Sequence, residues 1–220
     1  MTDELIESIL NESRSFAPSK KFIKQANLNK EEAERLKEEA SRNHIEYWAK
    51  LAKDELDWFL PFKNILDESK APNYEWFNDG EINASFNSLD VNASNNPEKT
   101  AIIFEAEDGK SERITYKELL SRTSQFANGL KKLGVVQMDR VVIYMPMCPE
   151  AVIAMQACAR IGAIHSVVFG GFSSNALKDR IEDAEAKIVI TADGAYRSGN
   201  IVPLKQATDE AVAQSSHEVK

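Results

Sequence analysis

The sequence has 220 residues, 43% of them hydrophobic and 28% charged, and this composition predicts a soluble globular chain rather than a disordered one. Its formal net charge of -8 excludes general nucleic-acid affinity, because there is no surplus of positive charge to neutralise phosphates. With two cysteines, an acidic amino terminus and no apolar run of membrane-spanning length, we expect a cytoplasmic protein without a disulfide framework, a zinc site or a membrane segment.

Residues 1–92 are expected to form a helical and irregular amino-terminal extension. Asn29 and Glu32 have the spacing of a capping box ahead of the charged segment 31–56, which predicts one long exposed helix. Residues 56–92 follow no period of two or 3.6, so we expect them to wrap over a neighbouring domain. Anchoring this segment, rather than forming a ligand cage, is the favoured role of its aromatic side chains, Trp58, Phe59, Phe62, Trp76 and Phe77.

From residue 100 onward the apolar residues recur at regular spacings. Residues 100–115 alternate around an Asp-Gly pair at 108–109, which predicts a β-hairpin. Thr115 and Glu118 have capping-box spacing, so a helix is expected to begin there and to end at Gly134.

Strands and helices then alternate to the end of the chain. Apolar strands are expected at 139–145, 163–168 and 187–191, and helices at 149–162, from Ser173 or Ser174, and at 203–216. This βαβαβ order predicts an α/β fold with a doubly wound, mostly parallel sheet that carries helices on both faces. We interpret residues 93–220 as the first part of a larger flavodoxin-like domain, truncated at its carboxyl end because 217–220 resemble the approach to a further strand.

Two segments lie where such a sheet binds ligands, beyond the carboxyl ends of its strands. Gly170 and Gly171 follow the strand at 163–168, but no Gly-Lys-Ser/Thr or G-x-G-x-x-G accompanies them, so the residues alone favour a tight turn over a phosphate loop. Residues 192–200, expected to be a loop, contain Arg197 between glycines. A guanidinium there suits bidentate phosphate binding, and a solvated surface arginine is an equally good interpretation.

No catalytic constellation is visible in the sequence. The three histidines, His44, His165 and His217, lie on different predicted elements, and His165 is expected to be a hydrogen-bonded structural residue. The carboxylates fall on exposed helical faces, so no acid–base pair can be selected by spacing. We therefore assign no catalytic residue and no metal ligand.

Four segments carry a resemblance to a known family: WFLPF at 58–62, EWFNDGEINASFNSLD at 75–90, the run DRVVIYMPMCPEAVIAMQACARIGAIHSVVFGGFSSNALKDRI at 139–181, and AKIVITADGAYRSGN at 186–200. In these the chain resembles the AMP-forming acetyl-coenzyme A synthetases of the acyl-adenylating superfamily. The resemblance implies a two-step reaction in which a short carboxylate and MgATP give an acyl adenylate and pyrophosphate, and coenzyme A (CoA) then displaces AMP.

The resemblance also implies a CoA site. In this family the pantetheine arm runs along the backbone that is here Phe169, Gly170 and Gly171. The nucleotide phosphate lies near the loop that is here Arg197, Ser198, Gly199 and Asn200. The family usually has a second Lys or Arg where this chain has Asn200, so one phosphate-binding charge is lacking. At 88–92, SLDVN replaces the usual Leu-Asp-Arg-His ending, which leaves open whether acetate or another short acid is preferred.

Two classes of function follow. The first is the amino-terminal part of an acyl-CoA ligase. The complete ligase is expected to use ATP, CoA and Mg²⁺, whereas this part alone is expected to be inactive and to bind none of them tightly. The second is a stand-alone CoA or nucleotide binding module without chemistry. Small-molecule substrates are the expected partners in both, and an uncovered sheet edge is expected to make the fragment self-associate.

Overall fold

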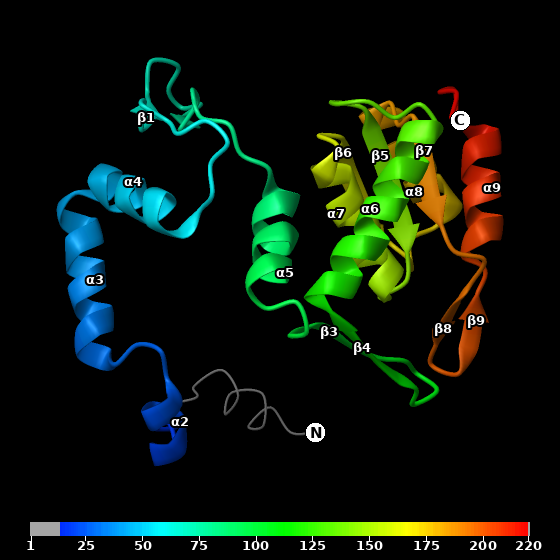
Figure 1. The fold of residues 1–220 in the computed structure, drawn as a ribbon. Coiled ribbons are helices and arrows are strands. Elements are labelled where there is room, and N and C mark those ends of the chain that lie inside the picture. Colours follow the sequence, from blue (N-terminus) through cyan, green and yellow to red (C-terminus); the bar gives the residue numbers. More distant parts are fainter. Residues whose placement is uncertain (1–13, 220) are drawn as a thin grey trace, which may run out of the picture. The chain divides into compact units, whose positions relative to one another are not determined.

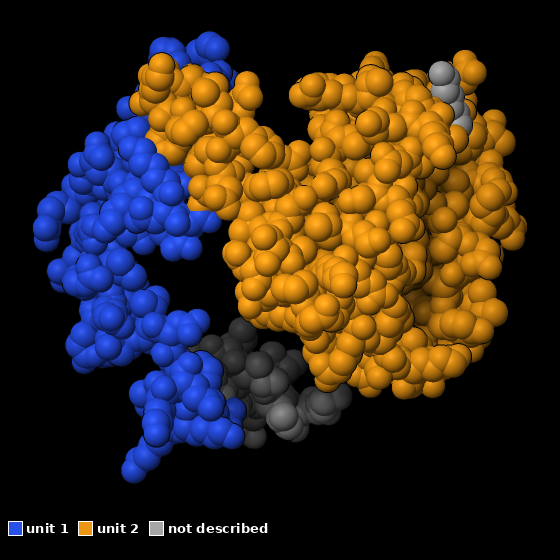
Figure 2. Space-filling model, viewed as in Figure 1, with its two compact units in different colours: residues 1–55, 65–76 blue, residues 56–64, 77–220 orange. Residues whose placement is uncertain are grey.

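The computed structural model describes residues 14–219 in two compact units. Among these residues, unit 1 combines 14–55 with 65–76, and unit 2 combines 56–64 with 77–219 (Figure 2). None of the helices within 14–219 is both long enough and apolar enough to span a membrane.

Unit 1 is mainly helical. Its elements are α2 (Lys20–Gln25), α3 (Lys30–Arg42), α4 (His44–Glu55) and the short antiparallel pair β1 (Leu66–Asp67) and β2 (Glu75–Trp76). The predicted capping box is confirmed: Asn29 Oδ1 accepts from the Glu32 amide at 2.8 Å, and the Glu32 carboxylate accepts from the Asn29 amide at 3.3 Å.

The prediction of one long helix in this unit was wrong. The chain leaves the helical conformation at Asn43, with φ -151° and ψ 85°, and divides the segment into α3 and α4. Asn43 Oδ1 accepts from the Glu46 amide at 3.2 Å, so the side chain satisfies an amide in the first turn of α4. Asparagine favours such local bonds over a continuous helix, and the helical periodicity on either side conceals the break.

Unit 2 holds the α/β part of the chain (Figure 1). Its elements are the π-helix η1 (Phe86–Asp90), α5 (Val91–Asn95), β3 (Thr100–Glu105), β4 (Ser111–Thr115), α6 (Tyr116–Lys132), β5 (Arg140–Met145), α7 (Pro149–Arg160), β6 (Ile164–Phe169), α8 (Ser174–Ala184), β7 (Ile188–Thr191), β8 (Ala195–Arg197), β9 (Asn200–Val202) and α9 (Leu204–Gln214). Strands and helices thus alternate from β5 to β7 as the sequence predicted.

The central sheet is parallel and has the order β6-β5-β7. Arg140 pairs with Ile164 and Met145 with Phe169, while Val141 pairs with Ile188. All three strands therefore end at the same edge, which is where the sequence placed its ligand-binding segments.

Alternate residues of β5 serve two apolar clusters on opposite faces of this sheet. Val141 and Ile143 pack with α6 and α7. Val142 and Tyr144 pack with α8 and α9. The sheet thus has helices on both faces, and β5 is a central, buried strand.

β6 is much less buried than its apolar sequence predicted. Ile164 is 45% exposed, and Val167 and Phe169 are each 55% exposed. Within residues 14–219, β6 pairs only with β5, so it is an edge strand. An apolar run is compatible with either position, and the sequence therefore does not separate a central strand from an edge strand.

The segments before the sheet are anchored by aromatic and ionic contacts within unit 2. Trp58 lies edge-on to Phe62 at 4.9 Å between ring centroids, and Phe62 packs against Phe77 at 4.4 Å. Arg160 at the end of α7 makes a bidentate pair with Asp90 of η1, at 2.6 and 2.9 Å. Trp58, Phe62 and Phe77 contact one another, whereas Phe59 is 61% exposed and Trp76 belongs to unit 1, so anchoring by all five aromatic side chains stays a prediction.

Two hairpins lie at the same end of unit 2 (Figure 1). The predicted β3–β4 hairpin is confirmed, with Gly109 in the left-handed region at φ 83°. The second hairpin, β8–β9, occupies the segment that we expected to be a loop. Ser198 at φ 51° and Gly199 at φ 76° form a two-residue turn that lets Arg197 pair with Asn200.

Candidate functional site

Three of the residues singled out from the sequence come together beyond the ends of the parallel strands. Phe169 is the last residue of β6, and Arg197 is the last residue of β8. The Arg197 Cζ atom lies 5.4 Å from the centroid of the Phe169 ring, within the range of a cation–π contact. We call Phe169, Gly171 and Arg197 the arginine cluster.

Gly171 belongs to this cluster because its missing side chain leaves room for the other two. A Cβ atom built on Gly171 would lie 2.5 Å from Arg197 Nη1 and 2.7 Å from Phe169 Cε1. Gly171 has no positive φ, so the glycine is explained by close packing and not by backbone conformation.

Gly170 has a different reason to be glycine. Its Cβ would lie 3.2 Å from the carbonyl oxygen of Met145, the last residue of β5. The two glycines thus allow the chain to turn tightly over the end of the neighbouring strand. The residues alone favoured a tight turn over a phosphate loop for this pair, and the close contacts in the structure account for both glycines without a ligand.

A buried tyrosine holds the segment that follows the glycines. The Tyr144 hydroxyl donates to the carbonyl oxygen of Phe172 at 2.8 Å, and burial raises the pKa of Tyr144, so it remains a donor at neutral pH. Phe172 in turn lies edge-on to Phe169, with 6.0 Å between ring centroids. β5 therefore positions the aromatic member of the arginine cluster through a hydrogen bond and a ring contact.

The other predicted residues, Ser198, Gly199 and Asn200, form and flank the β8–β9 turn. The Asn200 side-chain amide donates to the Ser198 carbonyl oxygen at 3.2 Å, so this side chain closes the turn on itself. The Gly199 amide donates to Glu107 Oε1 at 2.8 Å. Asn200 is exposed and supplies no positive charge, in keeping with its departure from the expected cation.

Sequence reasoning missed Glu107. It lies in the β3–β4 turn, 92 residues from Gly199, and nothing in its local pattern distinguishes it from other exposed glutamates. A hollow of about 410 Å³ lies beside it, lined by Phe104, Ala106, Glu107, Asp108, Lys110, Ser111, Glu112 and Tyr196. Only the fold brings this carboxylate to the β8–β9 turn.

The two cysteines are poor nucleophiles. Cys158 is fully buried, and burial raises the pKa of its thiol to about 11. Burial also raises the pKa of Cys148, the residue before α7. Both thiols are protonated at neutral pH, and only a thiolate attacks an electrophile readily.

The histidines remain separate in the structure. His44 lies edge-on to Trp76 in unit 1, at 6.2 Å between ring centroids, and His217 Nε2 lies 3.0 Å from the Ala186 carbonyl oxygen. His165, for which we expected a hydrogen-bonded structural role, is exposed on the edge strand β6. Among residues 14–219 no group of three or more His, Cys, Asp or Glu side chains is placed to hold a metal ion.

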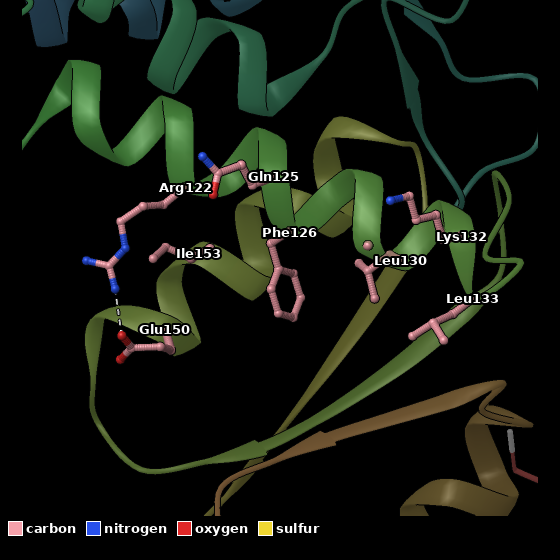
Figure 3. A pocket seen from close by; sticks show the side chains of 9 residues that line it. Arg122, Gln125, Phe126, Leu130, Lys132, Leu133, Glu150 and Ile153 are labelled. Carbon is pink, nitrogen blue, oxygen red and sulfur yellow. Dashed lines mark hydrogen bonds and ion pairs between the residues drawn. The ribbon is translucent and has the colours of Figure 1, made fainter.

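A larger groove of about 710 Å³ lies between α6 and α7, away from the arginine cluster (Figure 3). Phe126, Leu130 and Leu133 point along it, and Arg122 closes one end through an ion pair with Glu150 at 2.6 Å. Leu133, which directly follows α6, is 63% exposed. The groove is mainly apolar, its charged lining residues are Arg122, Lys132 and Glu150, and none of the predicted site residues lines it.

Comparison with known proteins places this chain in a family. Residues 89–220 match the family model described as AMP-binding enzyme, which is more than half of the chain. Residues 33–88 match a second model, described as the acetyl-coenzyme A synthetase N-terminus.

Curated relatives agree with these matches. The chain is 56% identical over 209 residues to the acetyl-coenzyme A synthetase of Thiobacillus denitrificans, with 94% of this chain and 32% of that protein covered. It is 56% identical over 215 residues to that of Ralstonia nicotianae, covering 97% and 33%. It is 52% identical over 206 residues to that of Pasteurella multocida, covering 93% and 32%. The chain thus spans about a third of the length of the curated relatives it matches.

Proposed function

The chain belongs to the AMP-binding enzyme family, and on this premise we propose that it is the amino-terminal part of an AMP-forming acyl-CoA ligase. The complete protein joins acetate or a similar short carboxylate to CoA through an acyl adenylate, with ATP converted to AMP and pyrophosphate. Residues 1–92 form its extension, and residues 93–220 begin its adenylating domain. Relatives more than half identical that are named acetyl-coenzyme A synthetases support the reaction and favour acetate as the acid.

We further propose that this part of the protein contributes to the CoA site. The observation that carries this proposal is the arginine cluster at the carboxyl edge of the parallel sheet. Arg197 offers a guanidinium that is always charged and can take a phosphate through two parallel hydrogen bonds. The Phe169 ring lies against that guanidinium. The proposal places the slender pantetheine arm along the backbone of Phe169, Gly170 and Gly171.

CoA is the only ligand that we assign to the described residues. The exposed guanidinium of Arg197, which lies against Phe169 and close to Gly171, suits a ligand that carries a phosphate. ATP and Mg²⁺ are required by the proposed reaction, and we assign no residue among 14–219 to either. Adenylation needs several positioned donors around the phosphates, and one arginine does not provide them.

Substitution of the arginine tests the CoA assignment. In the complete protein, Arg197→Ala should weaken CoA binding by about 10- to 100-fold, since a hydrogen bond to a charged group contributes roughly 1.5 to 3 kcal/mol. Binding of dephospho-CoA, which lacks the 3′-phosphate, should change little. The measurement is isothermal titration with both ligands, and Arg180→Ala, an exposed arginine on α8, is the control for the loss of one positive charge. Equal losses for both ligands would show that Arg197 has a structural role.

The 220-residue chain by itself should not form acyl adenylate. We expect no release of pyrophosphate from acetate and MgATP above the rate without protein, because the visible residues do not supply the phosphate donors that adenylation needs. A pyrophosphate-release assay measures this directly. Turnover that persists after repurification would contradict the proposal, and the complete protein is the positive control.

A further inference from the structure

The β8–β9 turn presents a backbone amide that is already occupied by a negative charge. In a two-residue turn the closing hydrogen bond joins the flanking residues, so the amide of Gly199 is left for another acceptor. That acceptor is Glu107 Oε1, at 2.8 Å. A carboxylate bound to an amide is a charge-assisted contact, stronger than one between neutral groups.

The β3–β4 turn, which contains Glu107, directs this side chain to the β8–β9 turn. The Ala106 amide donates to the Lys110 carbonyl oxygen at 2.7 Å, and the Gly109 amide donates to the Ala106 carbonyl oxygen at 2.9 Å. Asp108, the neighbouring acid, is engaged inside the turn, because its carboxylate accepts from both the amide and the ammonium of Lys110. The carboxylate of Glu107 is thus the one of these two acids that reaches Gly199.

Arg197 is the last residue before the same turn, so the turn carries a positively charged side chain on its own strand and holds the carboxylate of Glu107 on its Gly199 amide. A phosphate that approached Arg197 and the Gly199 amide would have to displace the carboxylate and would meet its negative charge. Such a penalty acts against anions and leaves uncharged ligand groups unaffected.

We propose that Glu107 is a specificity-determining residue that competes with the ligand phosphate for the Gly199 amide. The inference rests on the proposed function, in which the β8–β9 turn takes the nucleotide phosphate of CoA. Glu107 then sets how strongly the site prefers CoA to its dephosphorylated form, and it holds the turn in its hairpin conformation while no phosphate is bound.

The contact itself is tested by NMR on the ¹⁵N-labelled 220-residue chain. Glu107→Gln removes the charge and keeps the shape of the side chain, so the Gly199 amide resonance should move. Glu105→Gln on β3 is the matched control, since this exposed glutamate of the same hairpin undergoes the same change in charge. An unchanged Gly199 resonance in Glu107→Gln, or equal shifts in both variants, would overturn the proposal.

The competition is tested by titrating the same three proteins with inorganic pyrophosphate, and the same variants of the complete protein with CoA. Glu107→Gln should lower the concentration of pyrophosphate at which the Gly199 amide responds, and should tighten CoA binding by about two- to tenfold, the range of one exposed hydrogen bond. Dephospho-CoA binding should stay the same. Weaker CoA binding in Glu107→Gln would show that Glu107 supports the turn, and would overturn the competition.

The two ligands separate this inference from the proposed function. In one outcome, Glu107→Gln enhances the response of the Gly199 amide to pyrophosphate, but no variant prefers CoA to dephospho-CoA. Glu107 would then be a competitor at an anion site, and the assignment of that site to CoA would be contradicted. A preference for CoA that Glu107→Gln leaves unchanged would support the CoA site and overturn the role of Glu107.

Discussion

Two neighbouring side chains occupy the space beside Gly171. A substitution there should therefore affect the stability of the fold and the binding of CoA to different degrees. A Cβ there would meet Arg197 Nη1 and Phe169 Cε1, both of which can move. Gly171→Ala should therefore cost about 1 kcal/mol or less in the free energy of unfolding, while it pushes the guanidinium away from its present position. We expect CoA binding to the complete protein to weaken several-fold, as measured by titration, with a thermal midpoint close to that of the unmodified protein.

Gly170→Ala is the matched control for this substitution. Its Cβ would meet the backbone oxygen of Met145 at 3.2 Å, and backbone cannot move aside as easily as the end of a side chain. The loss should therefore be in stability more than in binding. If Gly171→Ala left CoA binding unchanged, the position of Arg197 over Phe169 would have no part in the site.

The residues of the site were predictable to different degrees. Gly170, Gly171 and Arg197 drew attention because they follow apolar strands, and chemistry at that edge is a general property of parallel sheets. Their mutual contact was not predictable, because it depends on a hairpin that aims Arg197 back at Phe169. Glu107 was beyond reach, since a contact across 92 residues leaves no trace in the local sequence.

At the scale of elements, one ionic contact ties three segments together at the opposite end of the sheet. Lys187, just before β7, donates to Asp139 Oδ2 at 2.6 Å and to the Gly134 carbonyl oxygen, beyond α6, at 2.6 Å. Asp139, just before β5, also accepts from the Val136 amide at 2.7 Å. The hydrogen bonds from Lys187 and Val136 lower the pKa of Asp139.

The lowered pKa of Asp139 determines how its contribution to the stability of the fold changes with pH. The carboxylate stabilises the fold fully above the pKa of the unfolded chain, near 3.9, and this contribution is lost as the pH falls through the lower folded value. Asp139→Asn should lower the free energy of unfolding at pH 7 by about 1 kcal/mol. The difference in free energy of unfolding between this variant and the unmodified protein, measured by urea titration, should become smaller below about pH 4. Asp183→Asn, an exposed acid on α8, should show no such difference, and a gap that stayed constant with pH would contradict the ionic contact.

Element order was the most predictable level of the fold, because it follows from strong apolar periodicity between residues 100 and 214. The boundaries that failed have local causes. Asn43 interrupts a continuous helical pattern through a single side-chain bond to the Glu46 amide. The β8–β9 hairpin escaped notice because each strand has three residues, too few for a period of two to show. The exposure of β6 depends on which strand lies beside it, and composition does not record that.

For the molecule as a whole, the edge strand β6 predicts self-association. Ile164, Val167 and Phe169 are exposed along a strand whose other side pairs with no strand among residues 14–219. Such edges pair readily with a second copy. We expect sedimentation velocity of the 220-residue chain to show dimers or larger species as the concentration rises.

Val167→Lys should shift this equilibrium to the monomer, since a charge on an edge strand opposes pairing. Ile103→Lys, at an exposed apolar residue on β3, is the control and should leave the association unchanged. A sedimentation coefficient that did not depend on concentration in the unmodified chain would show that β6 is not an association surface.

The burial of Cys158 also gives the protein a built-in kinetic reporter. Its side chain is fully enclosed between α7 and the sheet, so a thiol reagent can reach it only after that part of the molecule has opened. With Cys148 replaced by serine, a residue that suits the position before a helix, the rate of labelling would measure the frequency of these openings. The same labelling rate, measured as CoA is added, would show whether a ligand bound at the edge of the sheet makes local opening around Cys158 less frequent.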